Sequence, residues 1–239
     1  MRAGTAFCVN LINMNETLQT LIILAASLIG VIAVAAVVFV LLIKIKTTAR
    51  RRKIESYGRE SEARIDALLK KAFGEDAVFS GIYLPYLKSE EKKYAEIDHL
   101  VVTRAGICVI EVKSHNGYIR CPDERYWWQT YNDKKISFYN PLRQNKTHQK
   151  IVGEILRSEG QYNVPIYSVV VFTSRKVTFS GRYSNVIRTD KLIEYVRKNG
   201  RKNALSTSQT RRVRDIIKHR STTDKSVVRR HRSAMRSFK

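Results

Sequence analysis

Residues 96–113 read EIDHLVVTRAGICVIEVK, and two strongly apolar runs in this stretch carry charged side chains that need a physical reason. The runs at 97–103 and 107–114 are rich in β-branched residues, so both predict β-strands. Between them, Arg-Ala-Gly at 104–106 has the composition of a turn. The segment therefore predicts a β-hairpin.

The charged residues of this hairpin are spaced to share one face of a sheet. Side chains alternate along a strand, so Glu111 and Lys113 leave on the same face, and Asp98 on the neighbouring strand can reach it. Mg²⁺ takes oxygen ligands at about 2.0–2.1 Å and is usually held by one or two carboxylates, with waters and substrate phosphate completing its shell. We expect Asp98 and Glu111 to be that pair, with the backbone carbonyl of Val112 as a third oxygen.

Lys113 is the candidate catalytic lysine. A lysine beside a metal orients the attacking water and offsets the charge that develops on the phosphate oxygens. The alternative is an ordinary wet sheet face, on which a Glu-x-Lys pair is solvated and nearly inert. The hairpin alone leaves both interpretations open.

Four segments between 57 and 198 together resemble the PD-(D/E)xK nuclease superfamily and, more closely, its nuclease-related domain (NERD) branch. The first, YGRESEARIDALLKKAFG at 57–74, is similar to the family's opening Gly-x-x-Gly-Glu helix, with Ser61 where the second glycine is usual. The family's acidic position then falls on Glu62, and the helical stripe that continues to Leu69 predicts that this carboxylate lies in line with the buried face. The alternative is that Glu62 only favours the helix dipole.

The hairpin and the aromatic segment after it are the second and third segments of the resemblance. Asn-Gly at 116–117 predicts a two-residue turn, so we expect a strand at 118–120 to return antiparallel to the Glu111 strand. Trp127 and Trp128 point to opposite faces of a strand in YWWQTY. We expect at least one of them in the core and leave open that the other stacks on a base.

The fourth segment, NPLRQNKTHQKIVGEIL, resembles the family's Asn-Pro, Gln and His helix. Asn140 is a good N-cap and Pro141 a good first helical residue. Gln144 and His148 continue the apolar inner face of that helix toward its N-terminus, and the resemblance implies that they shape the active site by binding a phosphate oxygen or a metal-bound water. The alternative is that His148 is a hydrogen-bonded core histidine.

The rest of the domain completes a mixed sheet. The apolar run at 166–173 predicts a central strand buried on both faces, followed by a short strand at 186–188 and a helix at 190–198. We expect an α/β fold with a mixed central sheet of restriction-endonuclease-like type flanked by helices, in one globular domain at 57–198.

The uncharged run at 18–43 is longer than the roughly 30 Å hydrocarbon core of a bilayer and predicts one transmembrane helix before that domain. Basic residues are concentrated at 44–53, against only Arg2 before the span, so we expect 1–17 outside the cytoplasm and the C-terminal domain inside it. Residues 44–56 form a basic juxtamembrane connector able to touch anionic headgroups. The expected location is a bacterial inner membrane, crossed once.

Residues 199–239 predict a basic, disordered tail, because acidic residues are rare there and like charges repel. The net charge of +23 and the pI near 10.2 predict attraction to polyanions, nucleic acid or a lipid surface, and charge alone does not choose between them. Cys8, Cys108 and Cys121 are too few and too scattered for a disulfide framework or a zinc site.

Two classes of function follow. The first is a membrane-anchored nuclease that uses Mg²⁺ or Mn²⁺, with Asp98 and Glu111 as metal ligands, Lys113 assisting the water and Glu62 joining directly or through water. DNA is preferred over RNA as its partner because the superfamily acts mostly on DNA. The alternative is a non-catalytic membrane tether that binds nucleic acid or anionic lipid through the connector and tail. The oligomeric state is open.

Overall fold

The computed structural model describes residues 2–89, 93–224 and 226–230. The chain divides into two compact units, Met1–Ser56 and Tyr57–Lys239. We describe each unit by itself.

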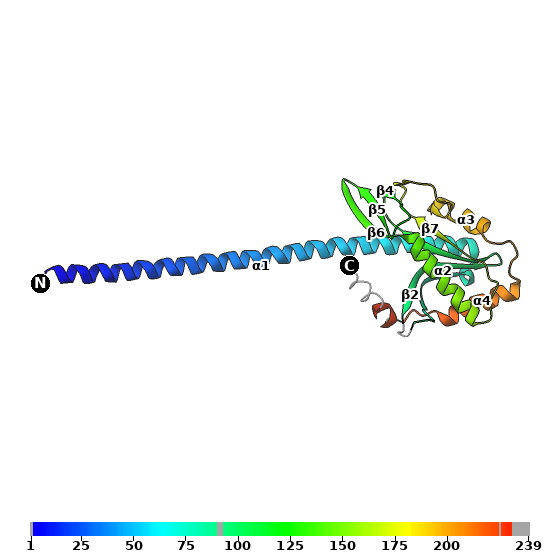
Figure 1. Cartoon of the computed structure of the whole chain (residues 1–239), viewed down its shortest axis with the longest axis horizontal. Helices are drawn as coiled ribbons and strands as arrows, with labels where there is room; N and C mark the ends of the chain where they lie inside the picture. The colour runs from blue at the N-terminus through cyan, green and yellow to red at the C-terminus, as the bar shows by residue number, and fades with distance from the viewer. Residues whose placement is uncertain (1, 90–92, 225, 231–239) are drawn as a thin grey trace. The chain divides into compact units, whose positions relative to one another are not determined.

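The first unit is the N-terminal part of helix α1 (Arg2–Phe73), and the rest of this helix belongs to the second unit (Figure 1). In the described part of the chain, α1 is the one helix long and apolar enough to cross a membrane, judged by length and composition. The apolar side chains that are described between 18 and 45 of this helix are exposed, Phe39 and Ile45 among them, whereas Ile65 and Leu69 farther along are buried. The connector at 44–56 belongs to the same helix, where Arg51 and Glu55 form an exposed ion pair.

The second unit is built on a five-stranded mixed sheet. Neighbouring strands β1, β2 and β3 run antiparallel, whereas β3, β7 and β9 run parallel. The predicted mixed α/β class is therefore confirmed. In spatial order the strands are β1 (Val78–Pro85), β2 (Tyr94–Thr103), β3 (Gly106–Lys113), β7 (Ile166–Phe172) and β9 (Val186–Arg188).

Helices cover both faces of this sheet (Figure 1). One face packs on α2 (Pro141–Ser158) and α4 (Thr207–Arg220), and the other on the C-terminal part of α1 and α3 (Leu192–Asn199). Two 3₁₀ turns, η1 (Glu75–Ala77) and η2 (Thr189–Lys191), precede β1 and α3. The predicted start of α2 is confirmed, because the Asn140 side chain accepts the backbone N–H groups of Leu142 and Arg143.

A second sheet corrects one prediction. We expected 118–120 to return along the Glu111 strand, but β4 leaves the main sheet and pairs with β5 and β8 instead. Gly117 makes this turn with φ 77°, and its N–H donates to the carbonyl of Lys176. The sheet order is β6 (Lys134–Tyr139), β5 (Tyr126–Tyr131), β4 (Gly117–Arg120) and β8 (Val177–Phe179).

The second sheet is held to the first by an apolar cluster that includes Trp127, Ile119 and Phe172. Trp127 is fully buried and its indole N–H donates to the carbonyl of Pro122, while Trp128 is half-buried. The prediction that at least one tryptophan lies in the core is confirmed. This cluster fixes the second sheet beside the end of β7.

The prediction of a disordered tail is wrong for α4. Val213 and Ile217 on this helix are fully buried in the core with Leu205 just before it. Its N-terminus carries a capping box in which Ser206 and Gln209 satisfy each other's backbone N–H groups. Three apolar positions at helical spacing, Val213, Ile216 and Ile217, are buried in the core and outweigh the repulsion between the like charges. The end of the tail, 231–239, lies outside the described residues.

Candidate active site

The site begins where β2 and β3 separate. The last Cα pair of their ladder is His99 with Ile110, and beyond it the Asp98 carboxylate accepts a hydrogen bond of 2.7 Å from the backbone N–H of Val112. The N–H and C=O of a strand residue point to the same edge, so the Val112 carbonyl also faces the Asp98 side. Asp98 thus takes the place of a ladder partner and is held beside that carbonyl.

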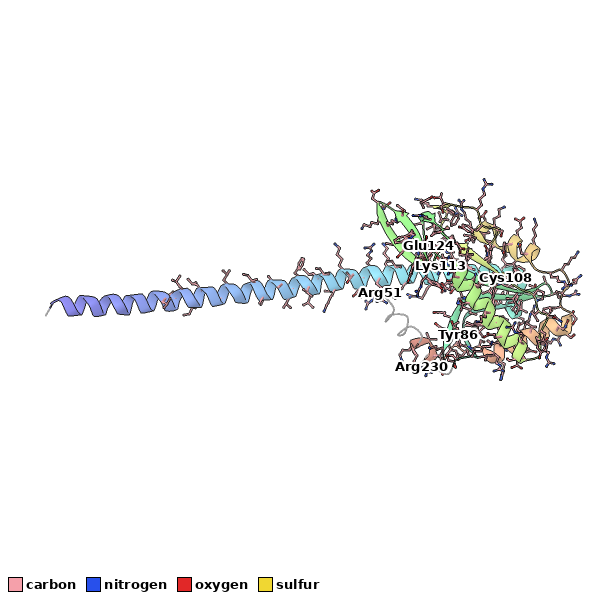
Figure 2. All side chains as sticks on the ribbon, viewed as in Figure 1. Arg51, Tyr86, Cys108, Lys113, Glu124 and Arg230 are labelled. Carbon is pink, nitrogen blue, oxygen red and sulfur yellow. The ribbon has the colours of Figure 1, made fainter. Side chains whose placement is uncertain are left out.

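Glu111 and Lys113 form a buried ion pair on the face of the sheet that α2 covers. The Lys113 ammonium donates to Oε1 of Glu111 at 2.6 Å and to the side-chain oxygen of Gln144 at 3.4 Å (Lys113 is labelled in Figure 2). Glu111 is only 2% exposed. Burial alone lowers the pKa of Lys113, but the charges of Glu111 and Asp98 outweigh it and raise the pKa, so the ammonium stays charged.

The Asp98 carboxyl is hard to ionise. Burial raises its pKa well above the usual value, and the neighbouring Glu111 raises it further. The Lys113 charge and the Val112 N–H offset part of this rise. Two carboxyl groups in one desolvated site repel each other when both are charged, and a cation between them relieves that repulsion.

Helix α2 brings its predicted polar residues to the same place. Nδ1 of His148 lies 3.7 Å from Oε2 of Glu111, and Gln144, one turn earlier, reaches Lys113. His148 is buried, yet it faces a carboxylate rather than the apolar core. The structure therefore brings together Asp98, Glu111, Lys113, Gln144 and His148.

Glu62 departs from its predicted position. The buried stripe of this helix runs through Ser61, Ile65 and Leu69, and Glu62, one residue along, is exposed. The prediction that it lies in line with the buried face is wrong, because that place falls to Ser61, whose hydroxyl accepts a hydrogen bond from Thr173 at 3.1 Å. The charge of Glu62 still reaches the site, since it contributes to the raised pKa values of Asp98 and Lys113.

The arrangement fits one hard divalent cation. Oε2 of Glu111 is buried and has no hydrogen-bond partner among the described residues, as expected of an oxygen that a cation or a water satisfies. Within the same described ranges, no group of three or more His, Cys, Asp or Glu residues forms a metal cage. The available set is two carboxylates and the Val112 carbonyl, a set of hard oxygen donors that suits Mg²⁺ or Mn²⁺ with water and phosphate in the remaining positions.

Two supporting residues escaped the sequence analysis. Asn145, buried beside Gln144 in sequence, donates to the carbonyl of Val169 at 2.9 Å and so ties α2 to β7. His115 stacks on Phe138 with ring centroids 4.1 Å apart, and burial together with the Lys113 charge lowers its pKa. The sequence contained a signal for each residue: Asn145 is a polar residue next to Gln144, and His115 follows Lys113 by two positions.

Residues 57–173 match the family model of the nuclease-related domain. The resemblance found in the sequence is confirmed for this part of the chain. All six predicted side chains, from Glu62 to His148, lie inside the nuclease-related domain match. An uncharacterized protein of Bacillus anthracis is 32% identical over 78 residues, which are 32% of this chain and 35% of that protein. The chain thus spans about a third of the length of that relative. No solved structure matches the chain.

Proposed function

We propose that the chain is a membrane-anchored, metal-dependent nuclease that hydrolyses phosphodiester bonds, with DNA preferred over RNA. The observation that supports this most is the meeting of Asp98, Glu111 and Lys113 beside α2, within a range that matches the nuclease-related domain. An isolated wet Glu-x-Lys pair would leave Glu111 solvated, whereas here it is buried against a lysine and a histidine.

Asp98, Glu111 and the Val112 carbonyl would hold Mg²⁺ or Mn²⁺. When bound, such an ion supplies a Lewis acid and lowers the pKa of water. Its charge would favour the ionised form of Asp98, whose pKa is raised by burial and by the neighbouring Glu111. Glu62, exposed at the edge of the site, would join through water.

Lys113 is the group assigned to the phosphate and the attacking water. Its ammonium is kept charged by Glu111 and Asp98, and its position is fixed from two sides by Glu111 and Gln144. A preorganised cation in a desolvated site is worth more to a developing negative charge than a solvated lysine. His148 would hold Glu111 in orientation from the other side.

Anchoring is the part of the proposal that α1 supports, through its length and its exposed apolar surface. The basic connector at 44–56 would face the same side of the membrane as the nuclease-related domain, because both follow the span. We propose the cytoplasmic face of a bacterial inner membrane. Substrate would then be cleaved close to the bilayer.

A cleavage assay on the full chain in detergent micelles tests the proposal. Single-stranded DNA, duplex DNA and RNA are each incubated with Mg²⁺, with Mn²⁺ and with EDTA. We expect cleavage only with metal, abolished by Glu111→Gln and unaffected by Glu194→Gln, which removes an exposed acid from α3. Cleavage that survives in EDTA or in Glu111→Gln would contradict the assignment.

A tether without catalysis is the second candidate, and one observation favours it. Basic side chains Arg211, Arg212 and Lys218 are exposed on α4. Removing everything after Lys198 would not test this candidate, because it would also remove a core helix. The sharper variant replaces these three residues with glutamine. The tether predicts lost nucleic-acid or lipid binding in that variant and no cleavage under any metal condition.

A further inference from the structure

The second sheet presents one face of aromatic and basic side chains to solvent. Its register places Tyr126 opposite Tyr139, Tyr118 opposite Thr130, and Arg120 opposite Trp128. Residues that oppose each other, or lie two apart on a strand, share a face. We call this surface the aromatic–basic face; it comprises Tyr118, Arg120, Tyr126, Trp128, Lys135 and Tyr139.

The opposite side of this sheet packs against the core. Ile119 and Trp127, which alternate with the face residues, are fully buried, and Phe138 packs against them. On the aromatic–basic face, by contrast, Tyr118 is 47% exposed and Tyr126 44%. Large aromatic side chains gathered on an exposed sheet surface mark an interaction site more often than chance exposure does.

Cations already lie over the rings of this face. The Lys135 ammonium is 4.8 Å from the Trp128 ring centroid, and the Arg125 guanidinium is 5.6 Å from that of Tyr126. Tyr126 and Tyr139 form an edge-to-face pair with centroids 6.3 Å apart. None of the residues whose side chains the register puts on this face is acidic. The face therefore offers ring surfaces and positive charge together.

We propose that the aromatic–basic face binds single-stranded nucleic acid by base stacking, with its arginine and lysine groups on the phosphates. Bases stack on aromatic rings with little regard to sequence, while cations follow the backbone. In a duplex the base faces are already stacked on one another, so rings set on an open sheet reach only unpaired bases. The occupant is thus a single strand rather than a duplex.

The face is joined directly to the candidate active site. Only residues 114–116 separate Lys113 from β4, and Gln129 of β5 donates to the Asn116 carbonyl at 2.7 Å. At the other end, β6 runs into α2 through the N-cap Asn140. That the bound strand is also the one cleaved rests on the proposed function; the binding itself does not.

Tryptophan fluorescence gives a direct test, because the chain has two tryptophans and one is sealed in the core. The full chain in detergent with EDTA is titrated with an oligothymidylate of about 20 nucleotides, long enough for one stacking platform. We expect quenching that Trp128→Phe removes, since Trp127 is out of reach of a base. Unquenched emission at saturating oligonucleotide overturns the proposal.

Affinity, measured by fluorescence anisotropy of labelled oligothymidylate, tests the tyrosines. The variant Tyr126→Ala with Tyr139→Ala is expected to raise Kd about fivefold or more, the effect of losing one stacked base. The matched control is Tyr131→Ala, because Tyr131 is 42% exposed on the same hairpin and points to the other face. It should leave Kd unchanged, and Phe in place of both tyrosines should restore binding. Unfolding curves identical to wild type confirm that each variant folds.

Other results would overturn the inference. Equal Kd values for the alanine variant and Tyr131→Ala would do so, as would a duplex that binds as tightly as the single strand. Phosphatidylserine vesicles that lose binding in the alanine variant, with oligothymidylate unaffected, would assign the face to lipid. Because binding is measured in EDTA, it does not depend on the metal site; cleavage that survives Glu111→Gln would contradict the proposed metal site and leave the stacking face intact.

Discussion

Lys113 and Glu111, two residues apart on β3, form a 2.6 Å ion pair in which the carboxylate is almost completely buried. Burying an ion pair gains little stability over apolar residues, but removing one partner strands a charge in a desolvated site. Replacing Lys113 should therefore lower both cleavage and stability, and a second substitution at Glu111 should restore only the stability.

Substitution of Lys113 tests these two effects. Lys113→Met should lower cleavage about 10²-fold or more, the usual effect of losing one preorganised group, and should destabilise the fold because Glu111 loses its cation. Adding Glu111→Gln should restore much of the stability but none of the activity. Urea unfolding and initial cleavage rates on the full chain measure the two effects, and full activity in Lys113→Met would remove the lysine from the mechanism.

The raised pKa of Asp98 predicts a pH dependence of stability. The folded chain binds a proton that the unfolded chain, with an ordinary aspartate pKa of 3.8, releases earlier. Without divalent metal, stability should therefore fall as pH rises from about that value up to the raised folded pKa. Mg²⁺ binds the ionised form, so its stabilising effect should grow over the same window.

Thermal unfolding of the full chain from acid to neutral pH, with Mg²⁺ or EDTA, measures this dependence. Asp98→Asn should flatten the curve in EDTA and remove the difference that Mg²⁺ makes. Identical curves for wild type and Asp98→Asn would mean that another group carries the titration.

Gln144 is expected to act by positioning Lys113. Gln144→Met removes the acceptor and should lower kcat about tenfold or more, as is usual for partners that orient a reacting group. Gln144→Glu keeps an oxygen there and should retain more of the rate. A lower kcat with unchanged KM supports positioning, whereas a change in KM alone would assign Gln144 to substrate binding.

Short-range patterns made much of this fold predictable. The β2–β3 hairpin followed from two β-branched runs around a glycine turn, and the start of α2 from Asn140 and Pro141. The shared face of Glu111 and Lys113 follows from the two-residue period of a strand, which needs no tertiary information. Local chemistry was sufficient wherever the partner groups lie within a few residues of each other.

The errors arose where tertiary contacts decide. An Asn-Gly pair favours a hairpin, but the donation from Gly117 to Lys176 and the pairing with β8 draw β4 into a second sheet. Both partners lie about 60 residues farther along the chain. Glu62 was misplaced by one helical position, a shift of about 100° around the axis that moves a side chain from the core side to solvent.

The last prediction concerns helix α4, whose basic composition predicted disorder although the helix packs in the core. Ile217→Ala should destabilise the full chain by about 2–5 kcal/mol, the range for truncating a buried isoleucine. Arg212→Ala, on the exposed side of the same helix, should change stability by about 0.5 kcal/mol or less. Urea unfolding monitored by tryptophan fluorescence compares the two, since Trp127 is buried in the same unit. In a disordered tail both substitutions would be neutral. A large loss for Ile217→Ala alone means that the nuclease-related domain needs a helix beyond its family match, so any fragment made for cleavage assays must extend past Arg220.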